Sequence, residues 1–163
     1  MGVVNGRVAS IQLLQAHGRR PRPVSEAVAV PGRGLEEDLH GKTREDGKRQ
    51  VLLMDTESLA ALGLSPGDLR DQVTLELPGL QGLPAGSLLR VGEAELELTG
   101  PCEPCTHIGE LLGKEDREAF QRSLVGRRGM LARVVSVTGE GRIRVGDPAE
   151  VLPSAATEPA EAR

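Results

Sequence analysis

Short runs of apolar residues, separated by glycine-rich turns, recur along the whole chain of 163 residues. Runs that alternate apolar with polar residues, or that are rich in Val, Leu and Ile, are typical of β-strands. The pattern predicts about eight short strands, drawn from residues 3–14, 24–30, 50–54, 69–77, 88–91, 94–99, 130–138, 142–145 and 149–152.

Two helices are expected between these strands. Asp55 can cap a helix that runs through Leu62, because an Asp side chain accepts hydrogen bonds from the free N–H groups of a first turn. Gly63 supplies the stop signal. Residues 114–125 have a helical pattern, and no regular alternation of strands with helices is visible. The sequence therefore predicts a mainly β fold, a closed barrel or sandwich with two or three minor helices, and the lack of βαβ alternation argues against a Rossmann or P-loop fold.

Composition narrows the partners that the fold could have. The chain has no Trp, no Tyr and one Phe, so its core must be aliphatic, and stacking of nucleic-acid bases on aromatic rings is excluded. The formal net charge of −4 gives no general attraction to DNA or RNA. The cations are 17 Arg against three Lys, and Arg suits bidentate recognition of phosphate and carboxylate.

The length fits one domain, which we place at residues 1–152, followed by a tail at 153–163 that lacks large apolar residues beyond its start and is expected to be disordered. No apolar run approaches the length of a membrane span, and the N-terminal residues lack the pattern of a signal peptide. We expect a cytoplasmic protein with no membrane and no nucleic-acid partner.

Cys102 and Cys105 form the strongest candidate for chemistry. Four interpretations stay open: a zinc site, a redox pair, one reactive thiolate, or two inert buried cysteines. Zinc would need four ligands, and no second pair of cysteines is present. A reactive thiolate would need nearby N–H groups or Arg side chains that lower its pKa.

Two polar segments supply further candidates. Asp38 and His40 are two residues apart, so in extended chain they share a face, where they could bind a metal or move a proton. Arg70, which opens a predicted strand, and Arg49, which precedes another, could clamp an anion. The alternatives are a solvated histidine and ordinary surface arginines paired with Asp71 or Glu76; Arg127 and Arg128 add a weaker basic rim.

Taken in order, four segments resemble the MOSC domain, which occurs at the C-terminus of molybdenum-cofactor sulfurases and as stand-alone bacterial proteins. They are RPVSEAVAVPGRGLEEDLH, RQVLLMDTESLAALGLSPGDLRDQVTLE, LPAGSLLRVGEAELELTGPCEPC and GRRGMLARVVSVTGEGRIRVGD, and the resemblance covers about residues 3–152. It implies a closed, pyruvate-kinase-barrel-like β-barrel that binds a molybdenum-pterin cofactor or carries sulfur as a cysteine persulfide.

The resemblance assigns roles to individual residues. Cys105 matches the family's functional cysteine, which is a thiolate ligand to molybdenum in cofactor-bearing relatives, and Cys102 matches an accessory cysteine. Arg70 matches an arginine that contacts the pterin or its phosphate. Gln72 stands where relatives usually have Asn, and we place it with Arg49 and Thr99 among the candidate cofactor-binding residues.

Asp38 and His40 match the family's Gly-Asp-x-His segment, in which Glu37 replaces the usual Gly. The family suggests three functions. The first is reduction of N-hydroxylated compounds at molybdenum, with an external electron donor. The second is a persulfide carrier that works with a separate pyridoxal-phosphate-dependent cysteine desulfurase. The third is a pterin-binding module without chemistry.

Overall fold

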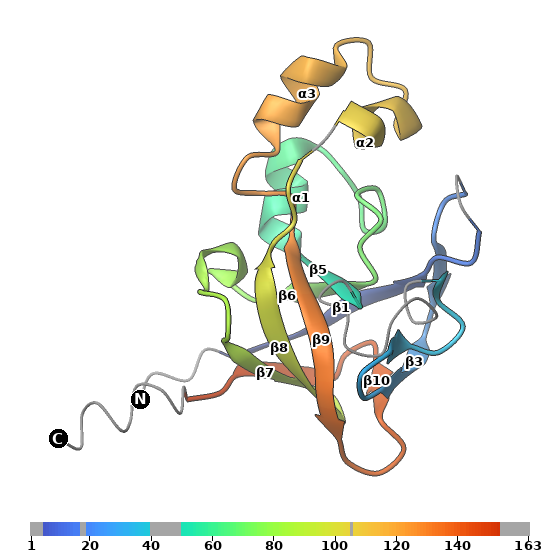
Figure 1. The fold of residues 1–163 in the computed structure, drawn as a ribbon, viewed down its shortest axis with the longest axis vertical. Coiled ribbons are helices and arrows are strands. Elements are labelled where there is room, and N and C mark those ends of the chain that lie inside the picture. The colour runs from blue at the N-terminus through green and yellow to red at the C-terminus, as the bar shows by residue number, and fades with distance from the viewer. Residues whose placement is uncertain (1–4, 17–18, 40–49, 105, 154–163) are drawn as a thin grey trace, which may run out of the picture.

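Seven strands close into a barrel in the computed structural model, which describes residues 5–16, 19–39, 50–104 and 106–153 (Figure 1). Their order around the barrel is β11-β7-β8-β9-β5-β6-β1, and pairing of β1 with β11 closes the ring. This confirms the predicted closed, mainly β fold. The strands are β1 (Asn5–Leu13), β5 (Val51–Asp55), β6 (Val73–Glu76), β7 (Leu88–Val91), β8 (Ala94–Pro101), β9 (Met130–Val137) and β11 (Pro148–Val151).

The predicted strand at 24–30 is two strands with different partners. β2 (Arg22–Val24) pairs with β1, and β3 (Glu26–Val30) pairs with β10 (Arg142–Arg144) and β4 (Gly34–Leu35). A bend at Ser25 separates β2 from β3. The small sheet β10-β3-β4 packs against β9 of the barrel, where the Gly32 N–H donates to the Val134 carbonyl.

The barrel contains one parallel connection. β5 and β6 are parallel, and α1 (Thr56–Leu62) connects them. The helix itself is as predicted, because the Asp55 carboxylate accepts a hydrogen bond from the Ser58 N–H and Gly63 ends the helix with a φ of 71°. The predicted strand at 69–77 is shorter, and residues before Val73 form a turn.

A helical cap, residues 102–129, is inserted between the paired ends of β8 and β9, where Pro101 lies opposite Met130. It carries α2 (Thr106–Leu111) and α3 (Arg117–Ser123); α3 confirms the predicted helix in shorter form, whereas α2 falls in a predicted loop. Figure 1 shows both helices over α1 at one end of the barrel. The cap and α1 share a small apolar cluster: Met54, Leu59, Leu69, Ile108 and Leu124.

The barrel core is built from Val, Leu, Ile, Ala and Met side chains, as the composition predicted. All five residues of β5 are buried, because Val51 and Leu53 face the barrel core while Met54 faces the cluster under the cap. A strand covered on both faces reads as a continuous apolar run rather than an alternating one. This explains the unbroken pattern at 50–54 in the sequence.

The ring closes tightly around Gly6 on β1. A Cβ atom there would lie 1.8 Å from the Glu76 carbonyl oxygen at the end of β6, so no side chain fits. β1 can consequently pair with β11 over its first residues and with β6 over the next. Of the predicted tail at 153–163, residues 154–163 lie outside the described residues. In the described part of the chain, no helix is long and apolar enough to cross a membrane.

Candidate functional site

Arg70 stands at the end of the turn that leads into β6, with a strained backbone. Its φ of 66° is one that glycine favours and that costs other residues about 1–2 kcal/mol. The Arg70 N–H donates to the Gly67 carbonyl at 2.9 Å, and the side chain is partly exposed with no hydrogen bond or ion pair among the described residues. Burial, and then the nearby charge of Arg128, lower the pKa of Arg70. Its guanidinium is therefore available to an anion.

Arg128 approaches the same turn from the cap, directly before β9. Its side chain is buried, with 9% exposed, and Nη1 donates to the Leu69 carbonyl at 2.9 Å. Its Nε is buried without a hydrogen-bond partner in the described part of the chain. Buried donors are nearly always paired, so an orphaned one needs an explanation such as an absent ligand.

Gly129, the residue after Arg128, allows the chain to pass close to β5, which places Arg128 next to the turn. Gly129 has a φ of 112°, and a Cβ atom there would come within 2.9 Å of the Leu53 carbonyl oxygen on β5. Its N–H donates to the side chain of Gln81 at 2.9 Å. The sequence ranked Arg128 only as a weak basic rim; the Arg-Gly pair before a strand was the signal of a buried arginine at a close backbone approach.

The Asp71 side chain hydrogen-bonds to the turn that carries Arg70, and it makes no ion pair with Arg70. It is fully buried, and its carboxylate accepts from the Gly67 N–H at 3.0 Å and the Thr74 hydroxyl at 2.5 Å. The side chain of Gln12 donates to its carbonyl at 2.9 Å. Burial raises the pKa of Asp71, and these hydrogen bonds and the charge of Arg128 oppose that rise. The alternative that Arg70 is an ordinary surface arginine paired with Asp71 is therefore wrong.

Asp38 and Gln72 are 34 residues apart in the chain but lie in contact in the fold. The Gln72 Nε2 donates to the Asp38 carboxylate at 2.7 Å, and both side chains are buried. Gln72 Oε1 accepts from the Leu52 N–H, and the second Asp38 oxygen accepts from the Leu14 N–H, each at 2.6 Å. The pair therefore ties the segment before β5 to β1, β5 and the start of β6.

Glu37 has a φ of 67°, a backbone conformation that glycine favours. Glu37 and Arg70 are the two described non-glycine residues with positive φ, and each lies within two residues of the Asp38–Gln72 hydrogen bond. Such strain persists only where the surroundings enforce it, and it clusters at functional sites.

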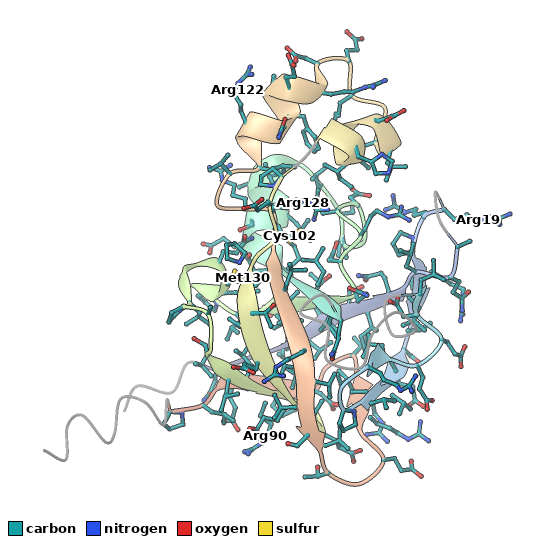
Figure 2. All side chains as sticks on the ribbon, in the orientation of Figure 1. Arg19, Arg90, Cys102, Arg122, Arg128 and Met130 are labelled. Atoms are coloured by element: carbon teal, nitrogen blue, oxygen red, sulfur yellow. The ribbon has the colours of Figure 1, made fainter. Side chains whose placement is uncertain are left out.

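Cys102 lies at the base of the cap, next to the segment that carries Arg128. It is a free, half-buried thiol, and its N–H donates to the Gly129 carbonyl at 2.9 Å (Figure 2). Pro104 accepts a hydrogen bond from Gln121 of α3 at 3.1 Å, which holds the cysteine loop to the cap. Thr99 lies half-buried on β8, before this loop.

The described residues thus join Arg70, Gln72 and Asp38 around one turn, with Arg128 and Cys102 on the adjacent segment. Cys105, His40 and Arg49 lie outside the described residues, so their predicted roles stay predictions. In the parts of the chain that are described, no group of three or more His, Cys, Asp or Glu residues could hold a metal ion.

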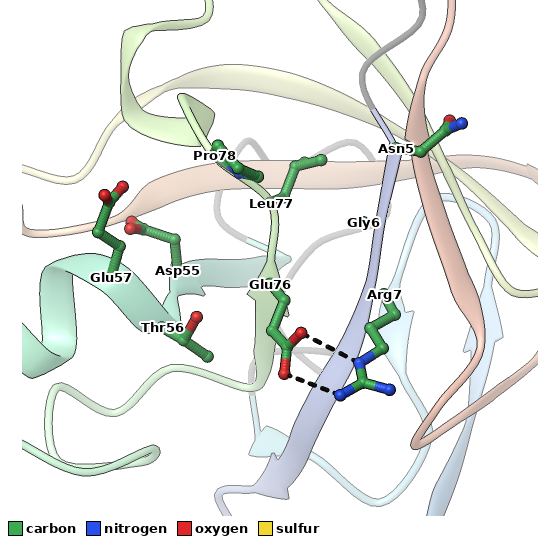
Figure 3. A pocket seen from close by; sticks show the side chains of 9 residues that line it. All are labelled: Asn5, Gly6, Arg7, Asp55, Thr56, Glu57, Glu76, Leu77 and Pro78. Carbon is green, nitrogen blue, oxygen red and sulfur yellow. Dashed lines mark hydrogen bonds and ion pairs between the residues drawn. The ribbon is translucent and has the colours of Figure 1, made fainter.

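A cavity of about 590 Å³ opens elsewhere, between the start of β1, the end of β6 and the start of α1 (Figure 3). None of the predicted site residues that the structure describes lines it. Arg7 and Glu76 face each other across its floor, with hydrogen bonds of 3.0 and 3.3 Å. Asp55 is already engaged by the Ser58 N–H and by Gln81. This cavity is therefore separate from the turn that carries Arg70.

Known structures share this fold over nearly the whole chain. The crystal structure of the YuaD protein from Bacillus subtilis has a TM-score of 0.77 and 21% identity, covering 91% of this chain and 96% of that one. YiiM from Escherichia coli has a TM-score of 0.67 and 16% identity, covering 91% of this chain and 71% of that one. YiiM from Geobacillus stearothermophilus has a TM-score of 0.67 and 18% identity, covering 91% and 75%.

At these identities the likeness concerns the fold alone. A search of curated proteins found no match. The profile of the MOSC domain matches residues 36–150, which include Asp38, Arg70, Gln72, Arg128 and both cysteines. The chain therefore belongs to the MOSC domain family.

Proposed function

We propose that this protein binds a molybdenum-pterin cofactor, whose phosphate is held by Arg70 and Arg128 and whose metal is bound by the thiolate of Cys105. The observation that carries the proposal is the Arg128 guanidinium, which is buried, has an orphaned Nε, and lies beside a second arginine without an ion pair among the described residues. Two adjacent cations with free donors fit an oxyanion with two or more charges.

The residues present fit such a group. An anion beside Arg128 would give its Nε an acceptor and would offset the repulsion that lowers the pKa of Arg70. Asp71 and the Asp38–Gln72 pair would hold the turn in its strained form, so that Arg70 needs little rearrangement on binding. A thiolate is also the ligand type that suits a soft, sulfur-rich metal centre.

The reaction class that we propose is reduction of an N-hydroxylated compound, in which the N–O bond is cleaved and the oxygen leaves as water. The bound cofactor would supply the redox-active metal for this chemistry. The protein itself would hold the phosphate at Arg70 and Arg128 and keep the cysteine segment against the end of β9 through the Cys102–Gly129 hydrogen bond. Electrons would come from a separate donor.

The test is cofactor content and activity of purified variants. We expect wild-type protein made with cofactor available to carry molybdenum and pterin in equal amounts. Arg128→Gln and Arg70→Gln should lower both, whereas Arg90→Gln, an exposed arginine on β7, should not. Cys105→Ser should lose reductase activity with a chemical electron donor. Wild-type protein without molybdenum, or variants that load equally well, would contradict the proposal.

A second candidate is a persulfide carrier, favoured by the free, half-buried Cys102 thiol beside the Cys105 segment. Cys105 would accept sulfur from a cysteine desulfurase, and attack by Cys102 on that persulfide would form a disulfide and release sulfide. Intact-mass measurement after incubation with a desulfurase and cysteine tests it. Equal sulfur uptake by Cys105→Ser would refute it, and unchanged pterin affinity in that variant would instead favour a binding module.

A further inference from the structure

A second basic site lies at the β1–β2 hairpin, outside the turn that carries Arg70. A cavity of about 330 Å³ there is lined by Leu13, Gln15, Ala16, Arg19, Arg20 and Arg22. Three of these six residues are arginines, and none of the described residues that line the cavity is acidic. We call this cavity the hairpin pocket. Such a concentration of positive charge is unusual in a chain whose formal net charge is −4.

The arginines of the hairpin pocket keep most of their donors free. Arg20 pairs with Asp68 at 2.5 Å, and its side chain is 60% exposed. The Nε of Arg22 donates to Gln15 at 3.1 Å, and its two terminal nitrogens make no hydrogen bond or ion pair among the described residues. The Arg19 side chain makes no hydrogen bond or ion pair among the described residues. Like charges gathered in this way repel one another unless an anion neutralises them.

The hairpin pocket is linked to the turn that carries Arg70 by an ion pair. Asp68, which holds Arg20, lies two residues before Arg70, and its carboxylate also accepts from the Ser65 N–H at 2.8 Å. Figure 2 shows Arg19 extending outward from the hairpin, whereas Arg128 lies beneath the helical cap. A group bound in the hairpin pocket would therefore sit at the rim of the site.

We propose that the hairpin pocket binds a phosphoryl group of the substrate, so that the preferred substrates are phosphorylated compounds. The substrate role depends on the proposed reductase function, but phosphate binding does not. The planar donors of Arg match phosphate oxygens in pairs, which a hydrated lysine cannot do. An exposed pocket at the rim suits a group that enters and leaves in each turnover.

The first experiment measures binding of inorganic phosphate and pyrophosphate by isothermal titration calorimetry. The test variant is Arg19→Gln with Arg22→Gln. The control is Arg90→Gln with Arg144→Gln, which removes the same charge from exposed arginines elsewhere. We expect at least about tenfold weaker pyrophosphate binding in the test variant and less than a twofold change in the control. No binding by wild type, or equal weakening in both variants, would overturn the proposal.

If the double variant does not fold, Arg19→Gln alone is used as the test variant. The Arg19 side chain makes no hydrogen bond or ion pair among the described residues, so its replacement removes none. It should weaken pyrophosphate binding in the same direction. This first experiment needs no cofactor, so it stands even if wild-type protein proves to carry no molybdenum. Failure of the proposed function and failure of the hairpin pocket are thus separate results.

The second experiment compares an N-hydroxylated nucleoside with its 5′-monophosphate as substrates of the holoprotein. We expect the wild type to have the lower KM for the monophosphate, and the test variant to lose that preference with kcat unchanged. Molybdenum content should be the same in wild type and test variant. A test variant that loads less cofactor, or that keeps the preference, would overturn the assignment to substrate.

Discussion

Replacement of Arg128 by methionine separates a functional from a structural role for this side chain. The substitution keeps a long side chain and removes the charge. Two effects on stability oppose each other. Leu69 loses the donor to its carbonyl, which costs about 1–3 kcal/mol for a buried acceptor, and removal of the orphaned Nε returns about 1–3 kcal/mol.

The free energy of unfolding should therefore change by less than about 2 kcal/mol. Removal of the Arg128 charge also removes its repulsion with Arg70, which should raise the free energy of unfolding of the variant. Binding of phosphate at this site should by contrast weaken about 10- to 150-fold, because a hydrogen bond to a charged group contributes about 1.5–3 kcal/mol. If Arg128 serves to bind a ligand, its replacement should leave the free energy of unfolding nearly unchanged and lower the affinity for phosphate.

Urea unfolding should be followed by far-UV circular dichroism, since the chain has neither Trp nor Tyr for fluorescence. Phosphate binding should be followed through the Nε–H resonances of arginine in the wild type, where the Arg128 signal is expected to shift. Arg90→Met is the matched control. A loss of more than about 4 kcal/mol without phosphate would show that Arg128 is structural. An unchanged phosphate affinity would refute the anion site itself.

Three further predictions concern the supports of the site. Burial raises the pKa of Asp71 above 3.8, so the wild type should lose stability relative to Asp71→Asn as the pH rises through that raised pKa; urea unfolding between about pH 3.5 and 7 checks this, and a constant difference contradicts it. Glu37→Gly should stabilise the protein by about 0.5–1 kcal/mol, because the relief of left-handed strain exceeds the added chain entropy; a lower thermal midpoint would count against strain at this position. Gly6→Ala should cost at least about 1–3 kcal/mol, since its Cβ would meet the Glu76 carbonyl; an unchanged urea midpoint would show that β1 can move away from β6.

The barrel could be predicted from the sequence because its signals are local. Apolar runs and glycine turns mark the strands, and Asp55 and Gly63 mark both ends of α1. The parallel pairing of β5 with β6 was missed, because a seven-residue helix and a turn between two strands leave little periodic signal. The helix α2 was missed because its six residues are too few to show a pattern.

For the candidate site, too, the sequence indicates individual residues but not the contacts between distant segments. Arg70, Gln72 and Asp38 could be proposed from the sequence because they belong to recognisable segments, but their contacts are not local. The sequence could not show that Gln72 would reach Asp38, 34 residues away, or that Asp71 would be buried beneath the turn. Arg128 was ranked too low, since burial of an arginine depends on how closely Gly129 approaches β5.

The parallel pair β5–β6 is what lets the site keep two strained residues. Gln72 bonds to the Leu52 backbone through both its own N–H and its side-chain oxygen, so the start of β6 is fixed to β5. The same side chain holds Asp38, and through it the turn of Glu37. Strain of about 1–2 kcal/mol at each of Glu37 and Arg70 is small beside the burial of all of β5 and of the first three residues of β6. Loss of the Gln72 amide should therefore release both turns together, so Gln72→Leu should weaken phosphate binding more than Glu37→Gly does, although neither residue is proposed to touch the phosphate.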